Sequence, residues 1–194
     1  MIGSLRGLIV AKAPPHLLLE VGGVGYELEA PMSTFYALPA VGETVRLVTH
    51  LVVRDDAHVL YGFATNDERG LFRNLLKVSG VGPRIALAIL SGTTVEGFAA
   101  CVLANEPAAL TRIPGVGRKT AERLIIEMRD RLDAGDSPAL QAGAFSGTAP
   151  QAEALAALVA LGYKPAEATR LLKSAGEADT TEELIRRALQ GAAK

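Results

Sequence analysis

The sequence is poor in cysteine, tryptophan and long apolar runs. Cys101 is the single cysteine among 194 residues, and tryptophan is absent. One cysteine excludes an internal disulfide framework and a cysteine-based zinc site. No run approaches the roughly 18 uninterrupted apolar residues of a membrane span, and the N-terminus lacks a basic segment followed by an apolar secretory stretch. We therefore expect a soluble cytoplasmic protein in a reducing compartment, with no membrane partner and no metal site.

The net charge is close to zero, because 20 Lys and Arg residues are balanced by 21 Asp and Glu residues. The distribution is uneven. Residues 64–133 hold 10 basic and 8 acidic side chains, whereas residues 1–63 hold 4 and 6 and residues 134–194 hold 6 and 7. Half of the cations thus lie in the middle segment. This modest bias is compatible with a nucleic-acid partner but does not demonstrate one.

Residues 1–63 have the pattern of β structure. Short runs of apolar and β-branched residues, such as residues 17–21 and 45–49, are separated by turn signals that include Pro14-Pro15. About five strands in a segment of this length suit a small closed barrel, which leaves no exposed sheet edge. Residues 33–38 are compatible with one helical turn between strands.

The rest of the chain is predicted to be helical, which makes the whole an α+β multidomain protein. In residues 64–133 apolar residues repeat at helical spacing. Residues 134–149 are rich in Gly, Pro and small residues without periodicity, which indicates a flexible linker. Residues 150–194 favour three short helices around a small core, typical of a module that docks elsewhere.

The middle segment repeats one motif at a spacing of 35 residues. Residues 75–86 align with residues 110–121, and each copy contains a helix end, a Gly-Val-Gly turn and a new helix that begins beside a cation. Glycine reaches backbone angles closed to larger residues and lets another backbone approach closely. The central valine is expected to anchor the turn inward. The new helix offers unpaired N–H groups and the positive end of its dipole to a phosphate, without reading any base.

This repeat predicts sequence-independent DNA binding, in which two hairpins hold the two strands across a minor groove. The candidate phosphate contacts are Lys77, Gly80, Val81, Gly82, Pro83, Arg84, Arg112, Gly115, Val116, Gly117, Arg118, Lys119, Thr120 and Arg123. The alternative is a pair of tight helix–helix turns without a ligand. The repetition in register, with cations at both copies, favours binding.

Two enzymatic motifs overlap the second hairpin. Residues 117–120 are similar to a phosphate-binding loop, but Arg118 interrupts the motif and no strand-loop-helix pattern precedes it, so we expect no bound nucleotide. The hairpin also resembles that of DNA glycosylases that use its lysine, here Lys119, as a nucleophile. Those enzymes need a downstream aspartate, and Asp136 comes nearest, at the start of the predicted linker. A glycosylase and abasic-site lyase therefore remains the alternative hypothesis.

Residues 54–57 form an acidic turn between two predicted paired strands. Asp55 and Asp56 are adjacent there, which is common at exposed turns because Asp favours both turns and solvent. A metal or acid–base site would need further ligands, and His50 and His58 are the only ones evident nearby.

Further motifs extend over nearly the whole chain. They are Met1-Ile2-Gly3, Leu5-Arg6-Gly7, Val21-Gly22-Gly23-Val24-Gly25-Tyr26, Leu60-Tyr61-Gly62-Phe63, Ala86-Leu87-Ala88-Ile89-Leu90-Ser91-Gly92, Thr120-Ala121-Glu122-Arg123-Leu124 and Ala157-Leu158-Val159-Ala160-Leu161-Gly162-Tyr163-Lys164-Pro165. Together with the hairpins, they resemble the RuvA family, the junction-binding subunits of the bacterial RuvA–RuvB branch migration complex. Arg84 and Arg118 stand where relatives often carry Lys, a change that keeps the charge.

The resemblance implies an OB-fold barrel at residues 1–63, a tandem helix-hairpin-helix domain at residues 64–133 and a mobile, UBA-like three-helix domain at residues 150–194. It also implies a homotetramer, single or as two facing tetramers in an octamer. Its concave face would hold a four-way Holliday junction open, with Asp55 and Asp56 as an acidic pin at the centre. On this basis we expect a non-catalytic subunit without a cofactor, active in homologous recombination and DNA repair.

The resemblance further implies that ATP and Mg are used by the partner RuvB, a hexameric AAA+ ATPase. The C-terminal domain would hold this motor. Candidates for the apolar contact are Leu158, Leu161, Tyr163, Leu171 and Leu172. At least half of them are expected to be core residues of so small a domain. The RuvC resolvase is a further candidate partner.

Overall fold

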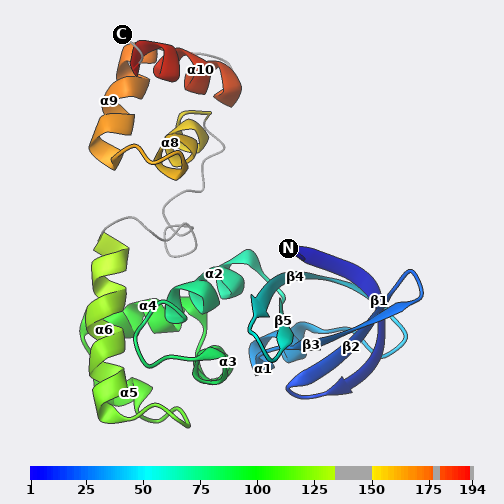
Figure 1. The fold of residues 1–194 in the computed structure, drawn as a ribbon. Helices are drawn as coiled ribbons and strands as arrows, with labels where there is room; N and C mark the ends of the chain where they lie inside the picture. Colours follow the sequence, from blue (N-terminus) through cyan, green and yellow to red (C-terminus); the bar gives the residue numbers. More distant parts are fainter. Residues whose placement is uncertain (134–149, 177–179, 193–194) are drawn as a thin grey trace. The chain divides into compact units, whose positions relative to one another are not determined.

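The computed structural model describes residues 1–133, 150–176 and 180–192. These residues form two compact units, one containing residues 1–133 and one containing the described residues from 150 onward (Figure 1). The predicted linker at residues 134–149 lies outside the described residues.

The N-terminal part of the first unit is a closed barrel with strand order β1-β2-β3-β5-β4. Its described strands are β1 (Ser4–Ala13), β2 (His16–Val21), β3 (Val24–Glu29), β4 (Thr44–Val53) and β5 (His58–Phe63). Neighbouring strands are antiparallel except β3 and β5, which are parallel and meet at Glu29 and Tyr61. The helix α1 (Met32–Ala37) lies between β3 and β4 in the chain. The predicted barrel and its single helical turn are confirmed.

Buried and exposed side chains alternate along β1, as expected for a strand with one face in a barrel core. Leu5 and Ile9 are buried in the barrel core, whereas Arg6 and Leu8 between them are exposed. Gly7 faces inward, where an added Cβ would lie only 2.1 Å from the carbonyl oxygen of Glu20. The two strands approach so closely at this point that only glycine fits.

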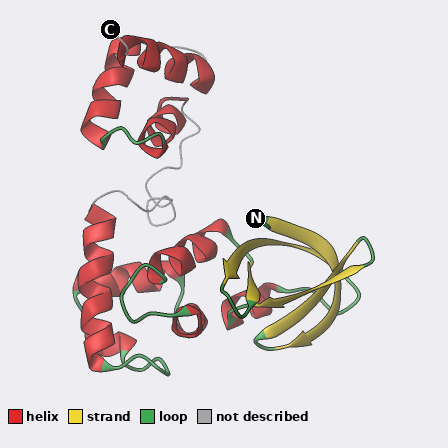
Figure 2. Cartoon of the chain, viewed as in Figure 1, coloured by secondary structure: helices red, strands yellow, loops and turns green. Residues whose placement is uncertain are grey.

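The helical part of the first unit packs against the barrel rather than standing apart (Figure 2). Its helices are α2 (Asn66–Leu75), α3 (Pro83–Gly92), α4 (Val95–Ala104), α5 (Pro107–Leu110) and α6 (Arg118–Asp133). The ring of Phe72 lies 4.9 Å, centroid to centroid, from the rings of both Tyr61 and Phe63. Strand β5 therefore contributes to the helical core. Residue 63 ends the β structure as predicted, but it does not separate two independent cores.

One buried carboxylate joins the barrel to α2. The Thr65 hydroxyl accepts a hydrogen bond from the Glu68 backbone N–H, and the Glu68 carboxylate accepts one from the Thr65 backbone, which is a capping box. The same carboxylate accepts hydrogen bonds from the hydroxyls of Ser33 and Thr34 on α1 and from the backbone N–H of Ala64. The start of α2 is thus held on the barrel by a charge-assisted network.

The second unit consists, in its described residues, of α8 (Pro150–Ala160), α9 (Pro165–Ala175) and α10 (Thr181–Ala192). The three predicted helices are confirmed. Leu158, Ala168 and Ala188 form the centre of its core. Leu158 is completely buried, so it offers no surface to a partner. Tyr163, Leu171 and Leu172 pack partly against this core, whereas Leu161 is 62% exposed.

No single helix in the described part of the chain is long and apolar enough to cross a membrane. The helices α3 and α4 reach the required length and hydropathy only when taken together, and they are bent by 95° at the break between them.

Candidate nucleic-acid interface

The two Gly-Val-Gly turns have the same backbone hydrogen bonds at the predicted 35-residue spacing. In the first turn, the N–H of Val81 donates to the carbonyl of Val78 at 3.1 Å, and that of Ala86 donates to Gly82 at 3.0 Å. The second turn repeats both bonds, from Val116 to Ile113 at 3.0 Å and from Ala121 to Gly117 at 2.9 Å. The two copies of the sequence motif therefore adopt the same backbone conformation.

The two glycines of each turn have different roles. Gly80 and Gly115 have φ values of 84° and 86°, the left-handed region that disfavours residues with a side chain. Gly82 has a φ of −91°, and neither Gly82 nor Gly117 is among the positive-φ residues of the described chain. A Cβ at either of these second positions would meet no protein atom within 4 Å. The protein fold therefore requires the first glycine, whereas the second leaves open space for a ligand to approach the backbone.

The central valines point inward as predicted. Val81 and Val116 are each 5% exposed and belong to the core of the helical part. Each valine therefore fixes its turn to the core, and the glycines on either side remain at the surface.

The helices that follow the turns present free N–H groups. No side chain caps α3, whose N-cap is Gly82 and whose first residue is Pro83. Because the first intrahelical donor is Ala86, the backbone N–H groups of Arg84 and Ile85 have no partner within the helix. These groups and the helix dipole favour an anion at this end of α3. In α6, which begins at Arg118, the corresponding first donor is Ala121, which bonds to Gly117.

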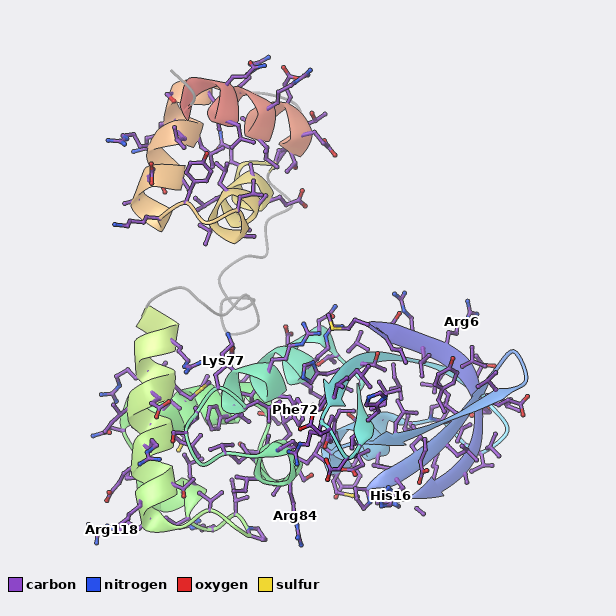
Figure 3. All side chains as sticks on the ribbon, viewed as in Figure 1. Arg6, His16, Phe72, Lys77, Arg84 and Arg118 are labelled. Carbon is purple, nitrogen blue, oxygen red and sulfur yellow. The ribbon has the colours of Figure 1, made fainter. Side chains whose placement is uncertain are left out.

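The predicted cations do not all lie together. Figure 3 shows Arg84 and Arg118 extending from the same edge of the first unit, beside the two turns. Lys77 lies well apart from both in that view, and its carbonyl accepts a hydrogen bond of 3.3 Å from Arg131, near the other end of α6. Proximity in sequence to the first turn thus does not bring Lys77 to its edge. Arg112, Arg118 and Lys119 are exposed.

Arg123 has a position that the sequence did not reveal. It follows the second turn in the chain, yet its guanidinium donates a 3.0 Å hydrogen bond to the carbonyl of Ser79, in the first turn. One arginine therefore ties the two hairpins together. This role uses one of its five N–H donors, so its predicted contact with phosphate stays a prediction.

Asp55 and Asp56 lie at the tip of the hairpin formed by β4 and β5, as predicted. The N–H of Arg54 donates a 2.9 Å hydrogen bond to the carbonyl of Ala57 and closes the turn, and both carboxylates are exposed. Their exposure gives them free access to a partner.

His50 is not arranged as a metal ligand with this turn. Its Nδ1 accepts a 3.2 Å hydrogen bond from Arg73, and its ring packs edge-on against Phe72. Burial, followed by the charges of Arg73 and Arg69, lowers the pKa of His50, so the ring is neutral near pH 7. Within the described residues, no group of three or more His, Cys, Asp or Glu side chains could hold a metal ion.

Lys119, the nucleophile of the alternative hypothesis, is exposed in the first turn of α6. The aspartate that a lyase would require, Asp136, lies outside the described residues.

The barrel and the paired hairpins define a protein of the tandem helix-hairpin-helix class, built to contact DNA backbone. Family models described as "RuvA N terminal domain", "SAM-like Helix-hairpin-helix tandem" and "RuvA, C-terminal domain" match residues 1–62, 72–130 and 149–193. The chain is 56% and 57% identical to proteins of Methylococcus capsulatus and Thioalkalivibrio sulfidiphilus over 100% of both chains, and 59% identical to one of Nitrosococcus oceani over 98% of both. Each relative is named Holliday junction branch migration complex subunit RuvA. The chain belongs to the RuvA family.

Proposed function

We propose that this protein binds four-way junction DNA through its backbone and serves as the junction-binding subunit of a branch migration complex. The observation that carries the proposal is the duplicated hairpin, with open space before Gly82 and Gly117 and a cation at the start of each following helix. Two such sites on one rigid unit suit the two strands of one duplex arm. The names of the relatives favour junction binding over the glycosylase alternative.

The acidic pin supplies the preference for a junction over plain duplex. A homotetramer, which the family resemblance favours, would gather one pair of Asp55 and Asp56 carboxylates from every subunit around the crossover. A carboxylate about 4 Å from a phosphate is repelled by about 1 kcal/mol in water and about 4 kcal/mol at an effective dielectric constant of 20. Losing one base-pair step costs about 1.4 kcal/mol. The repulsion is therefore large enough to help separate strands and to keep a duplex from passing straight through the centre.

Catalysis then belongs to a partner. The chain would act without a cofactor, while a RuvB-type ATPase consumes ATP and Mg. The second unit would hold this motor, with the 62% exposed Leu161 and the half-buried Tyr163 as its best-placed contacts. A RuvC-type resolvase is a further partner of the same complex, and we place the protein in the cytoplasm.

A gel-shift comparison tests the proposal. At matched salt, the protein should bind a four-way junction more tightly than a linear duplex made of the same arms. Replacing both pin residues, Asp55→Asn and Asp56→Asn, should leave junction binding intact or tighter, because like charges near the phosphates are removed, and should alter strand movement when the motor is added. Equal affinity for junction and duplex, or loss of binding in the double variant, would overturn the proposal. Light scattering with and without junction DNA would give the number of subunits.

A further inference from the structure

A groove of about 740 Å³ lies beside the acidic pin, between the barrel and α3. Its walls are the turn between β1 and β2, the end of β3, the start of α1, parts of β4 and β5 with the pin turn between them, and one side of α3. The groove lies wholly within the first unit, and Figure 3 shows two of its lining residues, Arg84 and His16, along the same edge. Its size is in the range of sites that enclose small organic ligands, about 300–1,000 Å³.

The floor of the groove is apolar. Met32, Leu87 and Ala88 line it, and all three are only partly or barely exposed. Ser91 also lines the groove but is occupied, since its hydroxyl donates to the Leu87 carbonyl at 2.7 Å and accepts from the Met32 N–H at 3.0 Å. The floor therefore offers an apolar contact surface, suited to the face of a base, and few polar partners of its own.

Charged groups of both signs stand at the rim. Arg54 enters from the pin and Arg84 from α3, and neither has a carboxylate within ion-pair distance among the described residues. Glu29 and Asp56 line the same groove. Burial and then Glu29 raise the pKa of Tyr61, while Arg54 lowers it, which indicates that both charges lie near this lining residue. The guanidinium of Arg54 suits a phosphate, since Arg84 also serves the first hairpin, and the carboxylates can accept hydrogen bonds from exocyclic amines.

We propose that this groove receives an unpaired nucleotide at the crossover of the junction, with its phosphate at Arg54 and its base on the floor formed by Met32, Leu87 and Ala88. The inference rests on the proposed function and adds a second half to the pin: the carboxylates repel the paired strands, and the adjoining groove holds a base that has left its stack. Two other occupants fit less well. The backbone of an intact duplex has no apolar group to cover the floor, and an acidic protein surface would be repelled by Glu29 and Asp56. A single nucleotide matches all three parts of the site. Holding the displaced base lowers the cost of unpairing it.

The test uses the full chain and a four-way junction with 2-aminopurine at each crossover position in turn. Unstacked 2-aminopurine is bright, and a base held in the groove should be bright yet shielded from acrylamide. Ala88→Phe fills the floor of the groove, and Ala100→Phe, on an exposed position of α4 outside the groove, is the matched control. With Ala88→Phe the probe should become dim again or open to acrylamide. Junction affinity by gel shift should fall only slightly, because the hairpins still hold the arms while the contact with the base is lost. The control should behave as the wild type in both measurements.

Several results would overturn the inference. A dim probe at every crossover position in the wild type means that no base leaves its stack, and unchanged shielding in Ala88→Phe means that the base lies elsewhere. A fall in oligomeric mass of Ala88→Phe without DNA means that a second copy of the chain covers the groove. Should Ala88→Phe fail to fold, Ala57→Leu on the exposed pin turn narrows the same groove and must give the same loss of shielding. If the wild type does not prefer junction over duplex, the proposed function itself fails, which the gel shift shows independently of the probe.

Discussion

Substituting the two glycines of each hairpin should have different effects: the first glycine is needed for the stability of the fold, and the second for DNA affinity. The first double variant is Gly82→Ala with Gly117→Ala, and the comparison is Gly80→Ala with Gly115→Ala. Both add the same two methyl groups to the same two turns. Only their backbone angles and surroundings differ.

The structure sets the expected magnitudes. At Gly82 the φ of −91° accepts alanine and the added Cβ meets no protein atom within 4 Å, so the cost should be limited to the poorer N-cap, about 0.5–1 kcal/mol. The same Cβ stands where a phosphate would approach the N–H groups at the start of α3. Losing one hydrogen bond to a charged group costs about 1.5–3 kcal/mol, or roughly ten- to a hundredfold in affinity for each hairpin. At Gly80 and Gly115, φ values of 84° and 86° impose about 1–2 kcal/mol of strain on each alanine.

Urea unfolding and fluorescence anisotropy of a labelled junction, at one salt concentration, measure the two effects. The 82/117 variant should shift the unfolding midpoint less than the 80/115 variant does, and should lose much more affinity than its small loss of stability explains. Wild-type affinity in a folded 82/117 variant would refute the reasoning, because nothing would then occupy the space before the second glycines.

Three further outcomes are expected. The lowered pKa of His50 makes its protonation unfavourable in the folded state. The free energy of unfolding should therefore be highest above pH 6.5 and fall as the pH drops below it, by less than the one-proton limit of about 1.4 kcal/mol per pH unit. In urea titrations at several pH values, His50→Gln should flatten this dependence, and the control His58→Gln, at an exposed position, should not. Glu68→Ala should destabilise the first unit by roughly 2–3 kcal/mol, since several donors lose their shared acceptor, and an unfolding midpoint equal to that of wild type would contradict the role given to this carboxylate. Leu161→Ala should weaken binding of the motor in a pull-down while leaving junction binding unchanged, and a motor that still binds fully would remove Leu161 from the contact.

The elements that local rules govern could be predicted from the sequence. The strands follow from alternation and turn residues, and the hairpins follow from glycines at fixed positions in two aligned copies. The capping box of Thr65 and Glu68 is also a local motif, although it was not predicted. Its link to Ser33 and Thr34 was not, because hydroxyls more than 30 residues away come into range only when the barrel closes.

The candidate site was predicted in composition but not in arrangement. Sequence proximity grouped Lys77 with the hairpin cations, yet the chain turns after α2 and leaves Lys77 beside the far end of α6. The reverse holds for Arg123, which is 44 residues from Ser79 in the chain and bonded to it in space. The groove beside the pin has walls from strands, turns and helices far apart in the chain, so no single stretch of sequence carries a sign of it.

The bond between Arg123 and Ser79 has a consequence for how weak contacts combine. Arg118 and Arg123 are separated by about 8 Å along the axis of α6, so the two hairpins are held at a short, fixed spacing. Once one hairpin is on a phosphate, the other meets its strand at an effective concentration that short tethers raise into the millimolar range. Neither contact then needs to be strong alone, and each can release and rebind while the other holds, which lets a protein keep hold of DNA as the strands move past it.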